Sequence, residues 1–410
     1  MLLTGIALLA VACGDGGGDS GQAADTSLGV DGTTTTAAPA TSAAPATTAA
    51  PKKIDTIPGM PGVPDPSNLY SEIKSGNFAD ATKGALTRVY VPNRAGDTVS
   101  VIDPASMQVV DTFEVGRNPQ HVVPSWDLTT LWVTNNAEGT TDGTVTPIDP
   151  KTGKPGPSVV VDDPYNMYFT PDGKYAINVA EARKRLDFLD PHTMKLVNSL
   201  DVPGCAGINH ADFTIDGKFV YFTCEFGGSI AKIDVVNHSV VGYLQLSQGG
   251  MPQDIRFSPD GNTLYVAEMM RGGVYTVDPN SFTETGFMDS GVGTHGLYPS
   301  RDGTKLYIAN RGSSHVGGPP NGPGSVSVLD FATRQIVATW PVPGGGSPDM
   351  GNVSNDGKTL WLSGRYDDVV YAIDTTSGNM TKIPVGAEPH GLTVWPQPGR
   401  YSLGHTGNMR

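Results

Sequence analysis

The chain has 410 residues, and its 27 Lys and Arg against 41 Asp and Glu give a formal net charge of −14. Proteins that bind nucleic acids need a basic face to neutralise phosphates, so this charge argues against a nucleic-acid partner. The 52 Gly and 33 Pro, with only 17% of residues charged, predict many short elements joined by tight turns and argue against a helical protein.

The chain begins with a short apolar run that ends at a cysteine. Residues 1–12 have the character of a secretory signal peptide, and Cys13 stands where a lipoprotein carries its lipid. We therefore expect an exported protein, anchored to the outer face of the cytoplasmic membrane or the cell surface and touching the membrane only through this lipid. The alternative is an ordinary cleaved signal peptide, because no Lys or Arg precedes the run and Ala10 stands where Leu is usual.

Residues 13–64 are rich in Gly, Asp and Ser and then in Thr, Ala and Pro. Such a segment has too little apolar surface to offset the loss of chain entropy on folding, so it is predicted to form a disordered stalk. Residues 65–86 are interpreted as an N-terminal extension of the domain that follows.

A β-type run that ends in an aspartate recurs seven times over residues 87–396. The aspartates are Asp103, Asp149, Asp190, Asp234, Asp278, Asp330 and Asp374, with spacings of 46, 41, 44, 44, 52 and 44 residues. Repeats of about 40 to 45 residues are typical of propeller blades, and the longest spacing indicates a blade with an insertion.

Asp-Gly turns such as those at Asp172 and Asp260 lie between two β-rich runs, as hairpins require. Each unit has room for four strands, but the first begins at its second strand, and residues 389–394 look like a first strand without followers. The sequence therefore predicts an all-β fold, a seven-bladed β-propeller whose C-terminal strand closes the first blade. Residues 397–410 are left as a C-terminal tail.

The units Arg88 to Asn93 with Val99 to Asp103, and Leu306 to Asn310 with Val326 to Asp330, closely resemble YVTN-type repeats of the YncE-like, surface-layer kind. The resemblance covers about three quarters of the chain and extends, more distantly, to the cytochrome d1 haem-domain propellers. It implies the fold, whereas similar propellers include binding proteins, lactonases and oxidoreductases.

The starts of the innermost strands should meet at one axial mouth of the ring. Aligning the blades places four of the eight histidines there, His121, His210, His295 and His390, together with Asp254 and Asp349. His295, Asp349 and His390 come from adjacent blades and form a candidate metal site, because two His and one carboxylate bind iron and related ions. The alternative is a polar, water-filled mouth without a metal.

Five of the 13 arginines occupy similar places in the loops between the second and third strands. They are Arg94, Arg183, Arg271, Arg311 and Arg365. Because guanidinium groups bind carboxylates and phosphates through paired hydrogen bonds, a small anionic ligand is expected at the mouth. The alternative is that these arginines pair with nearby carboxylates and stiffen the loops.

Cys205 and Cys224 fall in the fourth blade, and in an exported protein a disulfide between them is the default expectation. The competing hypothesis is a copper site formed by both cysteines, His210 and a methionine among Met251, Met269 and Met270.

These observations favour a monomeric binding module of the cell envelope that takes a small anionic ligand or an envelope protein. One alternative is an oxidoreductase-like propeller holding a metal or a haem-type cofactor at the mouth, and another is a lactonase. No residue set is diagnostic of catalysis, and the identity of any cofactor stays open.

Overall fold

The computed structural model describes residues 53–318 and 320–410. The predicted signal peptide, Cys13 and the stalk up to residue 52 lie outside the described residues. None of the helices in the described ranges is long and apolar enough to span a membrane.

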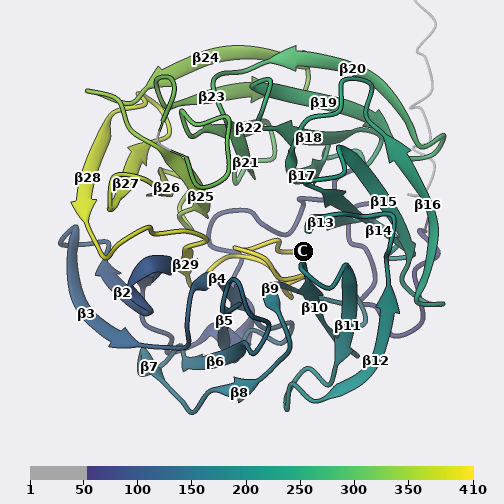
Figure 1. Cartoon of the computed structure of the whole chain (residues 1–410), viewed down its shortest axis with the longest axis horizontal. Helices are drawn as coiled ribbons and strands as arrows, with labels where there is room; N and C mark the ends of the chain where they lie inside the picture. The colour runs from purple at the N-terminus through teal and green to yellow at the C-terminus, as the bar shows by residue number, and fades with distance from the viewer. Residues whose placement is uncertain (1–52, 319) are drawn as a thin grey trace, which may run out of the picture. The chain divides into compact units, whose positions relative to one another are not determined.

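Seven antiparallel sheets follow one another around an axis, as Figure 1 shows. This confirms the predicted seven-bladed propeller. Blade 1 consists of β1 (Arg88–Asn93), β2 (Thr98–Asp103), β3 (Gln108–Glu114) and β29 (Thr393–Trp395). Blade 2 consists of β4 (Pro119–Pro124), β5 (Leu131–Asn135), β6 (Thr144–Asp149), β7 (Lys154–Pro155) and β8 (Val159–Val160). Blade 3 consists of β9 (Pro164–Phe169), β10 (Ala176–Ala180), β11 (Arg185–Leu189) and β12 (Leu196–Asp201).

The remaining blades each contain four strands in sequence order. Blade 4 consists of β13 (Ile208–Phe213), β14 (Phe219–Cys224), β15 (Ser229–Asp234) and β16 (Ser239–Gln245). Blade 5 consists of β17 (Pro252–Phe257), β18 (Leu264–Glu268), β19 (Gly273–Asp278) and β20 (Thr283–Asp289). Blade 6 consists of β21 (Thr294–Pro299), β22 (Lys305–Asn310), β23 (Ser325–Asp330) and β24 (Gln335–Pro341). Blade 7 consists of β25 (Pro348–Val353), β26 (Thr359–Gly364), β27 (Val369–Asp374) and β28 (Met380–Pro384), and two 3₁₀ turns are η1 (Asp80–Thr82) and η2 (Arg94–Gly96).

The ring closes through its last strand. β29 pairs antiparallel with β1, with Arg88 opposite Trp395 and Val89 opposite Val394. The prediction that the C-terminal strand completes blade 1 is therefore confirmed. Without β29 the edge of β1 that faces the axis would be unpaired, and the closed ring leaves only short sheet edges.

Burial falls from the axis outward. The inner strands β4, β13 and β17 are buried at every residue, whereas the outer strand β16 alternates between exposed and partly buried residues. Inner strands are covered on both faces by neighbouring blades, and outer strands have one face in water. Polar residues on inner strands are therefore exceptions that indicate the axial channel.

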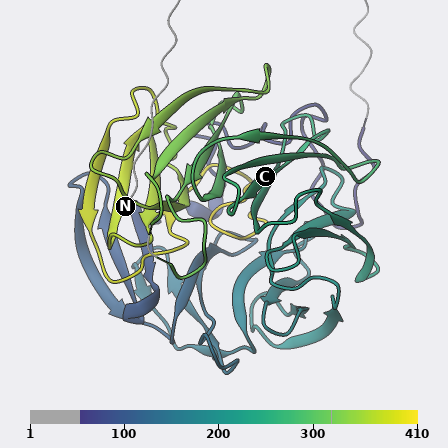
Figure 2. The same ribbon diagram turned by 45° about the horizontal axis from the view of Figure 1, so that its top comes forward.

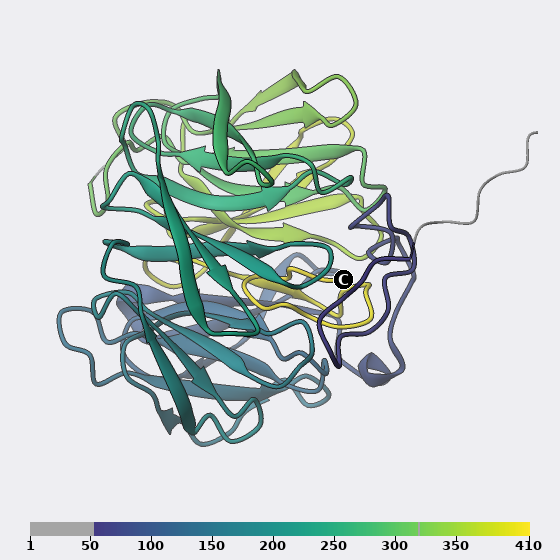
Figure 3. The ribbon, with the colours of Figure 1, turned by 90° about the vertical axis from the view of Figure 1, so that its right-hand side faces the viewer.

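The chain before the ring packs against one end of it. Ile57 is buried and its amide donates to the carbonyl of Asp216 at 3.1 Å, and the Tyr70 hydroxyl donates to the carbonyl of Phe257 at 2.7 Å. Figure 3 shows this segment at the same end of the ring as the C terminus. The packed part of the chain thus begins before residue 64, the predicted end of the disordered stalk.

The predicted tail, residues 397–410, enters the ring (Figures 1 and 2). His405 is fully buried, its amide donates to the carbonyl of Met167 at 2.8 Å, and the amide of Phe169 donates to the carbonyl of Leu403 at 3.0 Å. Arg410 at the chain end donates through Nη2 to Asp212 Oδ1 at 2.6 Å. The tail therefore fills the axial channel from one end.

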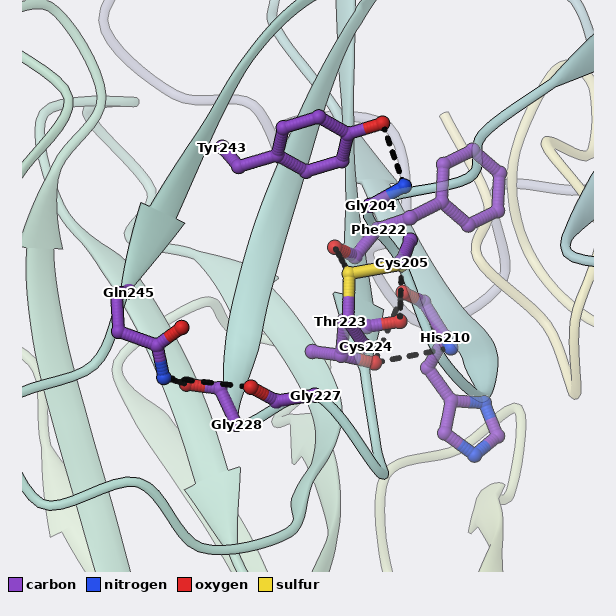
Figure 4. Close-up of a disulfide and its surroundings, with 10 residues drawn as sticks. All are labelled: Gly204, Cys205, His210, Phe222, Thr223, Cys224, Gly227, Gly228, Tyr243 and Gln245. Carbon is purple, nitrogen blue, oxygen red and sulfur yellow. Dashed lines mark hydrogen bonds between the residues drawn. A yellow bond between two sulfur atoms is a disulfide. The ribbon is translucent and has the colours of Figure 1, made fainter.

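A disulfide joins Cys205 and Cys224, with 4.8 Å between their Cα atoms (Figure 4). The chain before β13 folds back, since the amide of Cys205 donates to the carbonyl of Val202, and Ile208 lies opposite Cys224 in the sheet. Because both sulfurs are bonded to each other, neither is a thiolate ligand. The structure therefore contradicts the copper-site hypothesis that used these cysteines.

Replacing both cysteines by alanine should lower the free energy of unfolding by about 3 kcal/mol, the chain-entropy value for a loop of this length. The cysteines are 19 residues apart in sequence. Urea unfolding of the oxidised protein and of the double variant measures the difference. A difference below about 1 kcal/mol would contradict a structural role for this disulfide.

Candidate functional site

The side chains at the open mouth follow a simple rule of position. They come from the residue directly after the second strand of each blade, and in chain order these residues are Arg94, Asn136, Glu181, Glu225, Met269, Arg311 and Arg365. All but Met269 line a cavity of about 90 Å³ at the mouth. Its other lining residues include Gln120, Tyr165, Gln253 and His295 of the inner strands, and His390, which precedes β29.

Charge is divided across this mouth. The three arginines follow the second strands of blades 6, 7 and 1, which are neighbours around the closed ring. Glu181 and Glu225 follow the second strands of blades 3 and 4, which are also neighbours. One side of the cavity is therefore basic and the other acidic.

Arg365 is 8% exposed, and its Nε and Nη1 have no hydrogen-bond partner among residues 53–318 and 320–410. Burial lowers the pKa of its guanidinium, although the nearby Asp349 carboxylate opposes this shift. Arg311 is 3% exposed, with Nη1 at 3.7 Å from Asp349 Oδ1 and Nη2 donating to the carbonyl of His315 at 3.1 Å. Arg365 thus presents the least satisfied donors of the mouth.

Arg94 is paired with carboxylates. Its guanidinium forms ion pairs with Glu138 and Glu388, and its side chain is 19% exposed. It contributes positive charge to the basic side, but most of its donors are already engaged.

Two of the five predicted arginines do not line the cavity. Arg183 is half-exposed and pairs with Asp162, with 3.1 Å between Nε and Oδ2. Arg271 is exposed and lies over the ring of Phe287, 4.6 Å from its centroid. Both come two residues after the residue that directly follows the second strand of their blade, so the turn carries them outward.

The acidic side holds carboxyl groups that resist ionisation. Glu225 is 5% exposed, and its Oε1 and Oε2 accept from Gln253 Nε2 at 2.8 Å and from Asn209 Nδ2 at 2.9 Å. Burial raises the pKa of Glu225 in spite of these hydrogen bonds. Burial and the neighbouring Glu225 hold the pKa of Glu181 well above its usual value.

The predicted triad His295, Asp349 and His390 is assembled on the floor of the mouth. Asp349 Oδ1 lies 2.9 Å from His295 Nδ1, and its Oδ2 lies 3.6 Å from His390 Nε2. Burial opposes ionisation of Asp349, but His295 and Arg311 hold its pKa below the usual range. The guanidinium groups beside this carboxylate supply positive charge that would repel a bound cation.

His121, His210 and Asp254 lie one level deeper and do not line the mouth cavity. The imidazole rings of His121 and His210 are fully buried, with 5.6 Å between their centroids. His405 from the tail joins them, with centroid distances of 5.3 Å to His121 and 4.8 Å to His210. Asp254 is paired with Arg256 at 3.0 Å. Sequence reasoning missed His405, because nothing in the repeat pattern indicates that the tail returns to the axis.

The fold is shared with several solved structures. A gluconolactonase of Pseudomonas aeruginosa, PpgL, matches at a TM-score of 0.59 and 18% identity over 76% of this chain and 99% of that one. Hydrazine synthase of Kuenenia stuttgartiensis matches at a TM-score of 0.56 and 18% identity, over 67% of this chain and 88% of that one. The dihydro-heme d1 dehydrogenase NirN matches at a TM-score of 0.55 and 15% identity, over 78% of this chain and 76% of that one. At these identities the likeness shows the fold alone.

No curated protein matches the chain. Residues 65–398, which include all seven blades, match the family model of the YNCE-like beta-propellers. The chain therefore belongs to the YNCE-like β-propeller family.

Proposed function

We propose that this protein is a binding module of the cell envelope whose axial mouth takes a small hydroxy acid, with the anionic group of the ligand on the basic side. The observation that carries the proposal is the unpaired Nε and Nη1 of the buried Arg365. A buried donor without an acceptor costs about 1 to 3 kcal/mol, and more when it is charged. A carboxylate or phosphate oxygen at this place would remove that cost.

The other side of the cavity suits hydroxyl groups. Glu181, Glu225, Gln120 and Gln253 offer carboxyl and amide oxygens that accept hydrogen bonds. A ligand with an acidic group at one end and hydroxyls along its length would match both sides. The cavity of about 90 Å³ favours a small molecule of this kind over a haem-type macrocycle.

Thermal-shift and calorimetric titration with gluconate, inorganic phosphate and the neutral sugar glucose tests the proposal. Gluconate should bind, phosphate should compete with it for Arg365, and glucose should not bind measurably. If none of the three compounds binds to the folded protein, or if glucose binds as tightly as gluconate, the proposed ligand class is wrong.

The affinity for gluconate should fall as the pH rises from 5 to 8. The pKa values of Glu181 and Glu225 are raised, so both carboxyls stay protonated to higher pH and acquire negative charge as the pH rises. For an assumed separation of about 10 Å and an effective dielectric constant of 20, each new charge costs the bound anion about 1.7 kcal/mol, or roughly 15- to 20-fold in affinity. Calorimetry at both pH values measures the ratio. The double variant Glu181→Gln, Glu225→Gln should lose this dependence, and an affinity that rises with pH in the wild type would contradict the assignment.

Export and lipid anchoring belong to the same proposal. The apolar run before Cys13 supports them, and so does the disulfide, because disulfides persist in oxidising compartments outside the cytoplasm. Labelled palmitate should be incorporated into the wild type in its host and not into Cys13→Ser. Equal labelling of both would exclude Cys13 as the lipid site.

Lactone hydrolysis is the second candidate function. It is favoured by carboxyl groups of raised pKa opposite free arginine donors, an arrangement suited to proton transfer beside a developing carboxylate. The similar fold of a gluconolactonase fits this chemistry. Turnover of δ-glucono-lactone that is lost in Glu181→Gln would make the protein an enzyme, and binding of gluconate without turnover would leave it a binding module.

A further inference from the structure

We propose a transition-metal site below the mouth, formed by His121, His210 and His405, in which the C-terminal tail supplies the third ligand. Each residue offers one ring nitrogen, and these nitrogens lie within 4.8 Å of one another. Neutral imidazoles are preferred ligands of Zn²⁺, Cu²⁺ and related ions. The ion would be a divalent metal of this kind. This inference is independent of the anion proposed for the mouth.

The three histidines are buried together without enough hydrogen-bond partners. All three residues have 0% exposure. Both ring nitrogens of His121, and Nε2 of His210 and of His405, have no hydrogen-bond partner within the described part of the chain. Buried polar atoms in folded proteins are nearly always paired, so four unpaired atoms in three adjoining rings show that the protein alone does not satisfy this cluster.

The hydrogen bonds of Asn166 show which ring nitrogens of His210 and His405 carry lone pairs. Asn166 Oδ1 accepts from the amide of Met167 at 2.8 Å, which orients Nδ2 toward His210 Nδ1 at 3.2 Å and His405 Nδ1 at 3.0 Å. An amide nitrogen donates, so both Nδ1 atoms present lone pairs to the same point. Asp254 Oδ1 lies 3.9 Å from His405 Nε2 and favours a proton there, as carboxylates do behind metal-bound histidines. Metal binding at this point requires the Asn166 amide to turn aside.

The deeper site is better suited to a cation than the predicted triad on the mouth floor. In that triad Asp349 is already paired with His295 and lies 3.7 Å from the Arg311 guanidinium. The nearest arginine pair below is Arg256 with Asp254, whose charges cancel at 3.0 Å. The Arg365 guanidinium also acts on His121 from the mouth, but the triad faces both Arg311 and Arg365, so the three-histidine site has less positive charge beside it than the triad.

The site would also fasten the tail in the channel. His405 is the one ligand that does not come from a blade, and its ring stacks on Tyr168 with 6.0 Å between centroids. A metal that binds only the folded arrangement stabilises it in proportion to the logarithm of its concentration. Metal binding and docking of residues 397–410 are thus coupled.

The test is titration of the full, chelator-treated chain with Co²⁺, followed by displacement with Zn²⁺. One equivalent of Co²⁺ should bind with absorption bands of a nitrogen-ligated site, and X-ray absorption should show imidazole scattering. His405→Asn and His121→Asn should each weaken binding by at least about 100-fold, because loss of a ligand exceeds the 10- to 100-fold cost of losing a second-shell partner. Asn166→Ala should bind at least as tightly as the wild type.

His192→Asn is the matched control, since that side chain is 73% exposed, and it should bind like the wild type. Circular dichroism of each metal-free variant distinguishes the loss of a metal ligand from the loss of the fold. A rise in the Tm of the wild type on addition of Zn²⁺ is a further test of metal binding that does not depend on any variant. The proposal is overturned if the wild type binds no metal above the His192→Asn background. It is also overturned if binding survives His405→Asn and is lost in His295→Asn, which would assign the metal to the triad on the mouth floor.

Discussion

Replacing Asp212 by alanine should lower the free energy of unfolding by about 3–5 kcal/mol, the cost of leaving a buried charge without its partner. Asp212 is fully buried, and its Oδ1 accepts from Arg410 Nη2 at 2.6 Å and from Asn408 Nδ2 at 2.8 Å. Its Oδ2 accepts from the amide of Phe257 at 3.0 Å. The substitution leaves the 7%-exposed Arg410 without a counter-charge inside the ring. Urea unfolding and hydrogen exchange of the tail amides measure the effect.

The control for Asp212→Ala is Asp289→Ala at the exposed end of β20, which should change stability by no more than about 0.5 kcal/mol. Arg410→Met should lower the free energy of unfolding by a similar amount to Asp212→Ala. The double variant should lower it by less than the sum of the two single changes. If Asp212→Ala costs less than about 1 kcal/mol and leaves exchange of the tail unchanged, the tail is not held in the channel by this pair.

Replacing Arg365 by glutamine should weaken gluconate binding by about 100- to 1,000-fold, which corresponds to about 3–4 kcal/mol. The expectation follows from its unpaired Nε and Nη1 in a largely water-excluded site, where a charge-assisted pair of hydrogen bonds to a carboxylate is strongest. Isothermal titration calorimetry of folded variants measures the loss. Because the free protein no longer buries an unsatisfied guanidinium, Arg365→Gln should not be less stable than the wild type.

Arg271→Gln is the matched control for Arg365→Gln. Arg271 was a candidate for the same role, but it is exposed and lies over Phe287 away from the mouth. Its replacement should change the affinity by less than about twofold. Equal losses in both variants would indicate a diffuse charge effect and would contradict a specific site at Arg365.

The fold could be predicted from the sequence because it is a repeat. Seven aspartate-ended runs fixed the number of blades, and the unmatched strand near residue 394 indicated the closure that β29 makes with β1. Each Asp-Gly turn has a local cause: in the turn at Asp172, its Oδ1 accepts from the Thr170 hydroxyl at 2.7 Å, and Gly173 has a φ of +71° that suits glycine.

The site could be predicted only in part. The repeat indicates only the approximate place of an arginine in each loop, and of the five predicted arginines those directly after a second strand, Arg94, Arg311 and Arg365, line the mouth. Counting from the end of the second strand would have excluded Arg183 and Arg271 and found Glu181 and Glu225. Single-residue accuracy decides which side chain lines the mouth, because the chain reverses in the turn and carries a residue two positions further on away from the mouth.

The position of the tail could not be predicted from the repeat pattern. Residues 397–410 have no counterpart in the other blades, and their burial depends on contacts with Asp212, Met167 and Phe169 from distant parts of the chain. The same is true of His405, which no spacing relates to His121 or His210. Long-range contacts of this kind are visible only in three dimensions.

The most direct test of the account is a crystal structure of the protein grown with gluconate. We expect the carboxylate to lie within hydrogen-bond distance of Arg365 Nε and Nη1, with the hydroxyls toward Glu181 and Glu225. Gluconate bound at the outer surface of the blades, or a mouth that stays free of it at concentrations where calorimetry shows saturation, would contradict the proposal that this mouth is the binding site.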